Sequence, residues 1–139
     1  MFNATAEIEK AFEENGVKCR ISENEQMSGA QIHFVCENIE DLEFRFLSTD
    51  DNNDVTMVVP DIMRVAEGKL TEACIIMNRI NLENRFVKLV LDEDRIGAWY
   101  DFAKNTENIG AAAVEVAVRF AAVIDALYPQ LLETLGEKD

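Results

Sequence analysis

The sequence is poor in residues that interrupt or crosslink a chain. It has 2 Pro and 6 Gly among 139 residues, which argues against a linker or a low-complexity tract. Its three cysteines, Cys19, Cys36 and Cys74, are an odd number at wide spacing without a CxxC pair. A disulfide framework is therefore not expected. We interpret the cysteines as reduced, buried, small apolar side chains of a protein in a reducing compartment.

Histidine is equally scarce, since His33 is the only one. A single histidine excludes metal sites that need a histidine pair and weakens any histidine-dependent triad. Cys36 follows at an odd offset, which would place the two side chains on opposite faces of a strand, so we expect His33 at the surface. The motifs GxxxxGK[ST], GxGxxG and GxSxG are also missing. We therefore predict no catalytic residue, no cofactor and no metal.

One acidic segment imitates a calcium loop. Asp50, Asn52, Asp54 and Asp61 have the spacing of ligands 1, 3, 5 and 12. The sixth position, where a calcium loop needs Gly for its sharp turn, is Val55. We therefore interpret the segment as a polar hairpin turn.

Cationic residues are few: 13 Lys and Arg stand against 27 Asp and Glu, for a net charge of −14. Nucleic-acid affinity depends largely on protein cations that displace counterions from phosphates, so we expect no nucleic-acid partner. Anionic membranes are disfavoured for the same reason. The charge promotes solubility and suits a basic protein partner.

Signals for secretion or membrane insertion are lacking as well. The N-terminus has neither the basic start nor the apolar run of a signal peptide, so we expect a cytoplasmic protein. The Ala- and Val-rich segment 109–128 carries Glu115, Arg119 and Asp125 on one stripe of a helix. Such charges are costly in a bilayer, which favours a helix that packs against protein.

The hydrophobic pattern predicts one α+β domain over residues 1–139. Helical spacing predicts helices at 4–15, at 68–83, and from 105 or 106 to about 127, with a kink at Pro129 and a final turn that Gly136 ends. Period-2 alternation predicts strands near 17–21, 32–36, 42–46, 55–59 and 95–102, and a nearly continuous apolar run predicts another strand at 86–91. We expect Pro60 to end the fourth strand and 86–91 to be a central strand. Short polar links favour a mostly antiparallel sheet, in the order α-ββββ-α-ββ-α.

The last helix is apolar over more than one sheet face can cover. We expect a second surface to bury the excess, and a symmetric homodimer is the simplest source of one. The candidate interface residues are Val116, Phe120, Val123 and Ile124. The alternative is that the first or second helix covers them within the monomer.

Two smaller groups have structural interpretations. Trp99 falls on the strand face opposite Tyr100 and Phe102, yet no basic strip flanks these aromatics, so we expect core packing for all three. Asn78 and Asn81 lie three residues apart in the 68–83 helix. Asn is a poor helix former, so we expect it to cap or to bond neighbouring backbone.

Three segments carry a family resemblance: 75–81 (IIMNRIN), 86–89 (FVKL) and 96–100 (IGAWY). With them, the chain over about residues 60–130 resembles the YbjN-like family, described as bacterial sensory transduction regulators. That family is similar in fold to the type III secretion chaperones, which are small, acidic, dimeric proteins that bind extended segments of a client. The resemblance implies a chaperone-like fold and brings no catalytic or client-binding residue with it.

We therefore predict a non-enzymatic, dimeric protein-binding or regulatory module whose partner is a protein or a peptide segment. The alternative is a small-ligand carrier or an enzyme with an unrecognised pocket, for which Cys19, Cys36, Tyr100 and Asp101 would be the groups to consider. An immunity- or antitoxin-like partner role shares the same acidic signature.

Overall fold

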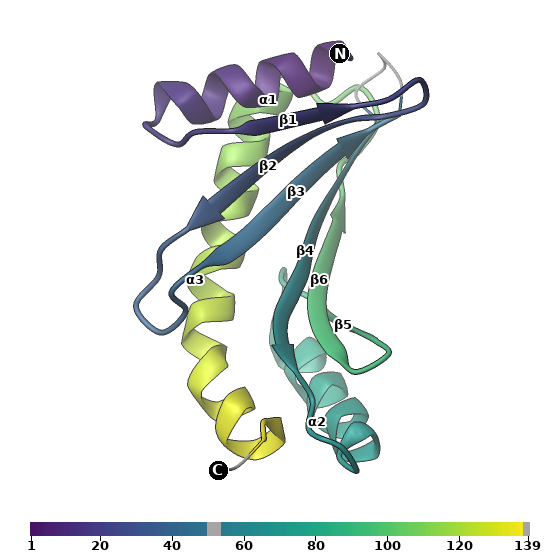
Figure 1. Cartoon of the computed structure of the whole chain (residues 1–139), viewed down its shortest axis with the longest axis vertical. Coiled ribbons are helices and arrows are strands. Elements are labelled where there is room, and N and C mark those ends of the chain that lie inside the picture. The colour runs from purple at the N-terminus through teal and green to yellow at the C-terminus, as the bar shows by residue number, and fades with distance from the viewer. Residues whose placement is uncertain (50–53, 138–139) are drawn as a thin grey trace.

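The computed structural model describes residues 1–49 and 54–137 (Figure 1). It has the predicted α+β fold and the predicted order of elements: α1 (Asn3–Glu14), β1 (Arg20–Glu23), β2 (Ser28–Phe34), β3 (Leu42–Ser48), β4 (Val55–Arg64), α2 (Leu70–Glu83), β5 (Leu89–Asp92), β6 (Arg95–Asp101) and α3 (Ile109–Leu135). The predicted turn between β3 and β4, with Asp50 and Asn52 of the calcium-like spacing, lies mostly outside the described residues.

The six strands form one sheet in the order β1-β2-β3-β4-β6-β5, and every neighbouring pair is antiparallel. Helices α1 and α3 pack on one face of this sheet, and α1 crosses α3 near its start (Figure 1). Alternate strand residues such as Phe44 and Met57 point to that face, where they meet Phe12 of α1 and Phe120 of α3. The alternation predicted from the sequence therefore produces a sheet with one buried face.

The two helices cross at a glycine. A Cβ atom on Gly110 would lie 2.5 Å from the carbonyl oxygen of Glu7 and 2.9 Å from the Cβ of Ala11. Both distances are far below van der Waals contact, so only glycine permits this approach. Gly110 is the second residue of α3, and it is buried against α1.

Strand β4 is longer than predicted. Pro60 was expected to end it, but the strand continues to Arg64 through an irregularity between Val59 and Met63, where its register with β6 shifts. Proline lacks a backbone donor, and a bulge removes the residue from the hydrogen-bond ladder. Gly97 lies opposite, where a Cβ atom would be 2.5 Å from the carbonyl oxygen of Val59. The glycine therefore gives the bulge the room it needs.

Strand β5 was predicted to be central, and this is wrong: it is a four-residue edge strand. Its outer edge is covered by Asn81 of α2, whose side-chain amide donates to the carbonyl of Leu89 at 3.0 Å and accepts from its N–H at 2.8 Å. This confirms the expected bond from Asn81 to neighbouring backbone. These two bonds occupy the backbone groups of Leu89, and they leave less of the strand edge open to pairing with another chain.

The last helix begins later than predicted, and its final turn ends at Gly136 as predicted. Asn105 and Asn108 both adopt left-handed conformations, which asparagine tolerates, so the chain turns twice before α3 starts at Ile109. The helix then continues through Pro129 to Leu135. Pro129 leaves the carbonyl of Asp125 without its helical donor. The side-chain amide of Asn38 donates to that carbonyl at 3.1 Å, and it thereby replaces the lost hydrogen bond.

Candidate functional site

The second face of the sheet is open to solvent. Its residues alternate with the core residues along β2, β3, β4 and β6, and in the described chain they are exposed or half-buried: Gln31, His33, Glu43, Arg45, Leu47, Thr56, Val58, Trp99 and Asp101. The strand register places them in rows across the sheet. One row runs from Gln31 through Arg45 and Val58 to Trp99, and the next runs from Leu47 through Thr56 to Asp101.

Trp99 dominates this face. Its side chain is 57% exposed, although it lies on β6, an interior strand of the sheet. Beside it is a hollow of about 360 Å³ that is lined by Met27, Leu47, Thr49, Asp54, Thr56, Val58 and Trp99. We call these seven residues together with Asp101 the Trp99 surface. Trp99 was predicted to pack in the core, and this is wrong. Its odd offset from Tyr100 in the strand is the signal that places it on the open face.

The carboxylates of the Trp99 surface are held by hydroxyl groups. Asp101 accepts a hydrogen bond of 2.6 Å from the hydroxyl of Thr56, and Asp54 accepts one of 3.2 Å from the hydroxyl of Thr49. Neither carboxylate forms an ion pair within the described ranges. Both charges therefore stay uncompensated by the chain's own cations.

A second group of polar residues lies farther along the same face. His33 Nδ1 is 2.6 Å from a carboxylate oxygen of Asp41, and Arg45 Nε is 2.6 Å from one of Glu43. The amide of Gln31 also donates to Glu43. His33 is exposed, as the sequence predicts. Arg45 offsets one of the two carboxylate charges, and the described residues of this cluster present no unpaired arginine or lysine to a ligand.

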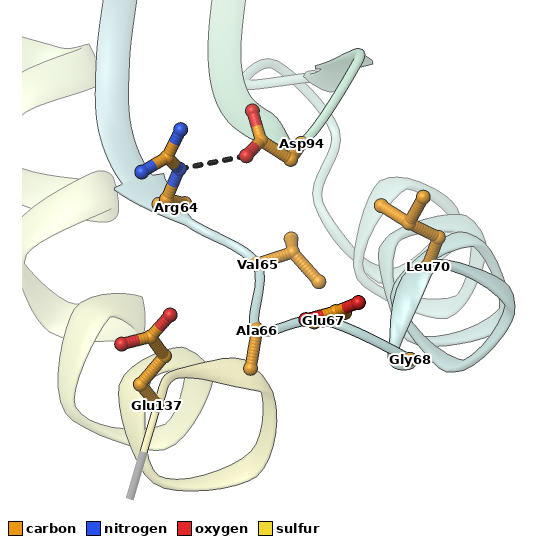
Figure 2. A pocket seen from close by; sticks show the side chains of 8 residues that line it. All are labelled: Arg64, Val65, Ala66, Glu67, Gly68, Leu70, Asp94 and Glu137. Atoms are coloured by element: carbon orange, nitrogen blue, oxygen red, sulfur yellow. Dashed lines mark hydrogen bonds and ion pairs between the residues drawn. The ribbon is translucent and has the colours of Figure 1, made fainter.

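Another hollow, of about 360 Å³, lies where four segments meet at the far end of the molecule (Figure 2). The ion pair of 2.7 Å between Arg64 and Asp94 borders it, and its hydrogen bond lowers the pKa of Asp94. Leu70 lies on the opposite side, and the N–H of Ala66 donates to the carbonyl of Leu135 across the floor. Arg64 and Asp94 pair with each other at the surface, which favours a structural junction over a binding pocket.

The four predicted interface residues of α3 are mostly covered by their own chain. Val116, Phe120 and Ile124 are at most 8% exposed, and Val123 is half-buried. The ring of Phe120 packs edge-on against Phe86 at 5.3 Å. α1 and the segment before β5 add to what the sheet buries, as in the alternative in which the monomer covers these residues, whereas Val118 and Leu132 of α3 stay exposed.

The groups considered for an enzyme do not come together. Tyr100 packs among core aromatics, whereas Asp101 points to the open face. All three cysteines are free, but the prediction that they are buried is wrong, because Cys19 and Cys36 are half-buried at the ends of strands and Cys74 is exposed. Burial, assisted by Glu9 and Glu13, raises the pKa of Cys19 to about 11. Burial and Asp125 also raise the pKa of Cys36. Neither thiol is activated for nucleophilic attack.

Helix α2 exposes more apolar surface than the sequence pattern predicts. Only Ala73 and Met77 of this helix are buried. Ile75 is 60% exposed and Leu82 is 79% exposed, one above the other on the outer face. The apolar stripe is wide enough to suggest a core helix, but α2 lies beside β5 at one end of the sheet and contacts little else (Figure 1).

Among the described residues, no group of His, Cys, Asp and Glu side chains is placed to hold a metal ion. Within the same ranges, no helix combines the length and the apolarity that a membrane span requires. No protein-family model matches the chain, and no curated protein matches its sequence.

Proposed function

We propose that this protein is a non-enzymatic binding module that contacts a protein partner through the Trp99 surface. The exposure of Trp99 carries the proposal. Single exposed apolar residues are common, but a large, rigid aromatic beside a hollow that Leu47 and Val58 line has the make-up of an interface anchor. The polar and charged residues around it resemble the rim of a protein interface.

The proposed partner is a protein and the proposed compartment is the cytoplasm. The net charge of −14 disfavours phosphate-rich partners, and the free cysteines suit a reducing environment. Membership of the YbjN-like family stays a prediction, as does the chaperone-like role that it implies.

Affinity capture with matched baits tests the proposal. The wild-type protein, Trp99→Ala and Val118→Ala are each immobilised and exposed to native host extract. Val118 is 52% exposed on α3, so its variant removes a comparable surface side chain elsewhere. We expect a protein retained by the wild type and by Val118→Ala but lost from Trp99→Ala. Equal retention by all three baits would contradict the proposal.

We further propose that the protein is a homodimer, with the interface on α2 in place of α3. Ile75 and Leu82 are spaced i, i+7 on the outer face, with Asn78 between them. In an antiparallel pair of α2 helices, Ile75 of each copy can meet Leu82 of the other, which buries the two most exposed large apolar side chains of the helix. Such a contact is isologous, as a two-fold dimer requires.

The charge around α2 permits two copies to approach. The whole chain carries −14, yet residues 69–85 balance three cations against two carboxylates: Lys69, Arg79 and Arg85 against Glu72 and Glu83. Antiparallel pairing would bring Glu72 of one copy toward Arg85 of the other. A helix of this length is about 21 Å long, so each subunit would bury on the order of 400 Å², half of a standard interface. The dimer should therefore be weak.

Light scattering after size exclusion tests the dimer at concentrations from about 1 to 500 μM, a range chosen for weak association. We expect a rising dimer fraction for the wild type and for Val118→Glu, and a monomer for Ile75→Glu with Leu82→Glu. A wild-type monomer throughout the range would refute self-association, and a dimer in the α2 variant would refute this interface.

A further inference from the structure

We infer that the Trp99 surface recognises a cationic segment of its partner, with an arginine or lysine side chain over the indole and an apolar side chain against Leu47 and Val58. This inference rests on the proposed function, because it names the chemistry of the partner at the same surface. It does not depend on the dimer.

The arrangement of charge around the indole supports a cation. Asp101 follows Trp99 by two residues on the same strand face, which places the two side chains about 7 Å apart. Asp54 lines the hollow on the β4 side. Thr56 pairs with Asp101 in the row next to Trp99, and Asp54 precedes Thr56 by two residues, so both carboxylates lie on the same side of the indole along the strands. A cation that stacks on an indole gains from the ring quadrupole, and carboxylates on one side of it add charge pairing.

The cation in the row of Trp99 is already paired. Arg45, which lies in the same row as Trp99, is held by Glu43 at 2.6 Å. The hydroxyls of Thr49 and Thr56 orient Asp54 and Asp101 without neutralising them. An external cation is thus the complement that the surface lacks in the described part of the chain.

The same surface also needs an apolar complement. Met27, Leu47 and Val58 line the hollow next to the indole, and Leu47 and Val58 are half-buried. A purely basic segment would leave this apolar area exposed to water. The carboxylates would repel a phosphate-bearing partner. The fitting occupant is a protein segment in which cationic and apolar side chains alternate.

The single tryptophan makes the test direct, because all indole fluorescence comes from the site. The probes are two blocked ten-residue peptides, acetyl-(Arg-Val)5-amide and acetyl-(Glu-Val)5-amide. We expect saturable change in Trp99 emission with the arginine peptide, weakened by added salt, and none with the glutamate peptide. Absence of an emission change with the arginine peptide at millimolar concentration would overturn the inference.

Matched charge variants separate the site from the overall negative charge. Asp54→Asn with Asp101→Asn keeps the acceptors for both threonine hydroxyls and removes two charges. Glu13→Gln with Glu14→Gln removes two charges from exposed positions on α1. By calorimetry we expect the first pair of substitutions to lower the affinity for the arginine peptide about tenfold. The second pair should lower this affinity less than twofold. Equal effects would show non-specific attraction and overturn the inference. Circular dichroism confirms that each variant is folded.

Failure here is distinguishable from failure of the proposed function. A captured partner that depends on Trp99 but is unaffected by Asp54→Asn with Asp101→Asn would refute the cationic segment and leave the binding module standing. A partner that binds Trp99→Ala as well as it binds the wild type would refute both the binding module and the cationic segment.

Discussion

Replacing Asn38 with alanine should destabilise the protein chiefly because α3 contains Pro129. Proline cannot supply the N–H that the carbonyl of Asp125 would otherwise accept. Asn38 fills that place from the β2–β3 loop with a hydrogen bond of 3.1 Å. The loop is fixed independently, since the carboxylate of Asp125 accepts the backbone N–H groups of Glu37 at 3.2 Å, Asn38 at 2.8 Å and Ile39 at 3.0 Å.

The expected magnitude follows from one lost hydrogen bond. Asp125 is half-buried, so water can partly replace the amide, and Asn38→Ala should lower the free energy of unfolding by about 1 kcal/mol. With a urea m-value of about 2 kcal/mol/M for a domain of this size, the unfolding midpoint should fall by about 0.5 M. Circular dichroism at 222 nm during urea unfolding measures this shift.

A double-mutant cycle isolates the role of the proline. Pro129→Ala supplies an N–H to the same carbonyl, so Asn38→Ala should cost only about 0.3 kcal/mol in that background. The weak contact of 3.5 Å between the amide of Asn38 and the carboxylate of Asp125 cancels, because it is lost in both backgrounds. Asn78→Ala, at an exposed position on α2, is the matched control and should show no coupling to Pro129. Equal costs of Asn38→Ala in both backgrounds would refute this explanation.

Three other outcomes follow from the fold and its thiols. Gly110→Ala should lower stability by about 2–3 kcal/mol in thermal unfolding, because its methyl group would collide with the backbone of α1; an unchanged midpoint would contradict the close crossing. Phe120→Leu should cost about 1–2 kcal/mol in urea unfolding, since it removes a fully buried ring from the core; a neutral effect would contradict its placement there. Iodoacetamide at pH 8 should modify exposed Cys74 first. The Cys19 rate should rise with pH until about 11, because only the thiolate reacts; a plateau near pH 9 would contradict the raised pKa.

The fold class and the order of elements could be predicted because most strands have one solvent-exposed face, and their residues therefore alternate between apolar and polar. The sequence of β3 alternates between apolar and polar residues from Leu42 to Phe46, and this predicts both its secondary structure and its buried side. Segment 86–91 has no such alternation. Its apolar residues serve two purposes: Phe86 packs against α3, and Leu89 pairs with β6 at the sheet edge. A continuous apolar run therefore indicates burial but does not distinguish a central strand from an edge strand.

The candidate site could be predicted only in part. The face of Trp99 follows from its parity within β6, but residue type favoured the core, and parity proved the better guide. The burial of Val116, Phe120 and Ile124 could not be predicted, because it depends on how α1 and α3 meet at Gly110. Contacts between elements distant in the sequence leave no periodic signal. The hydrogen bond from Asn38 in the β2–β3 loop to Asp125 in α3 also joins elements distant in the sequence, so it could not be predicted either.

The most direct test of the central claim is fluorine NMR of protein labelled with 5-fluorotryptophan. The chain has one tryptophan, so the free protein should give one resonance, and its shift should respond to D₂O because the ring is exposed. On addition of the unlabelled protein captured from extract, we expect the resonance to move and to lose that solvent response as the ring is buried. A resonance that keeps its position and its solvent response in the saturated complex would contradict a binding role for the Trp99 surface.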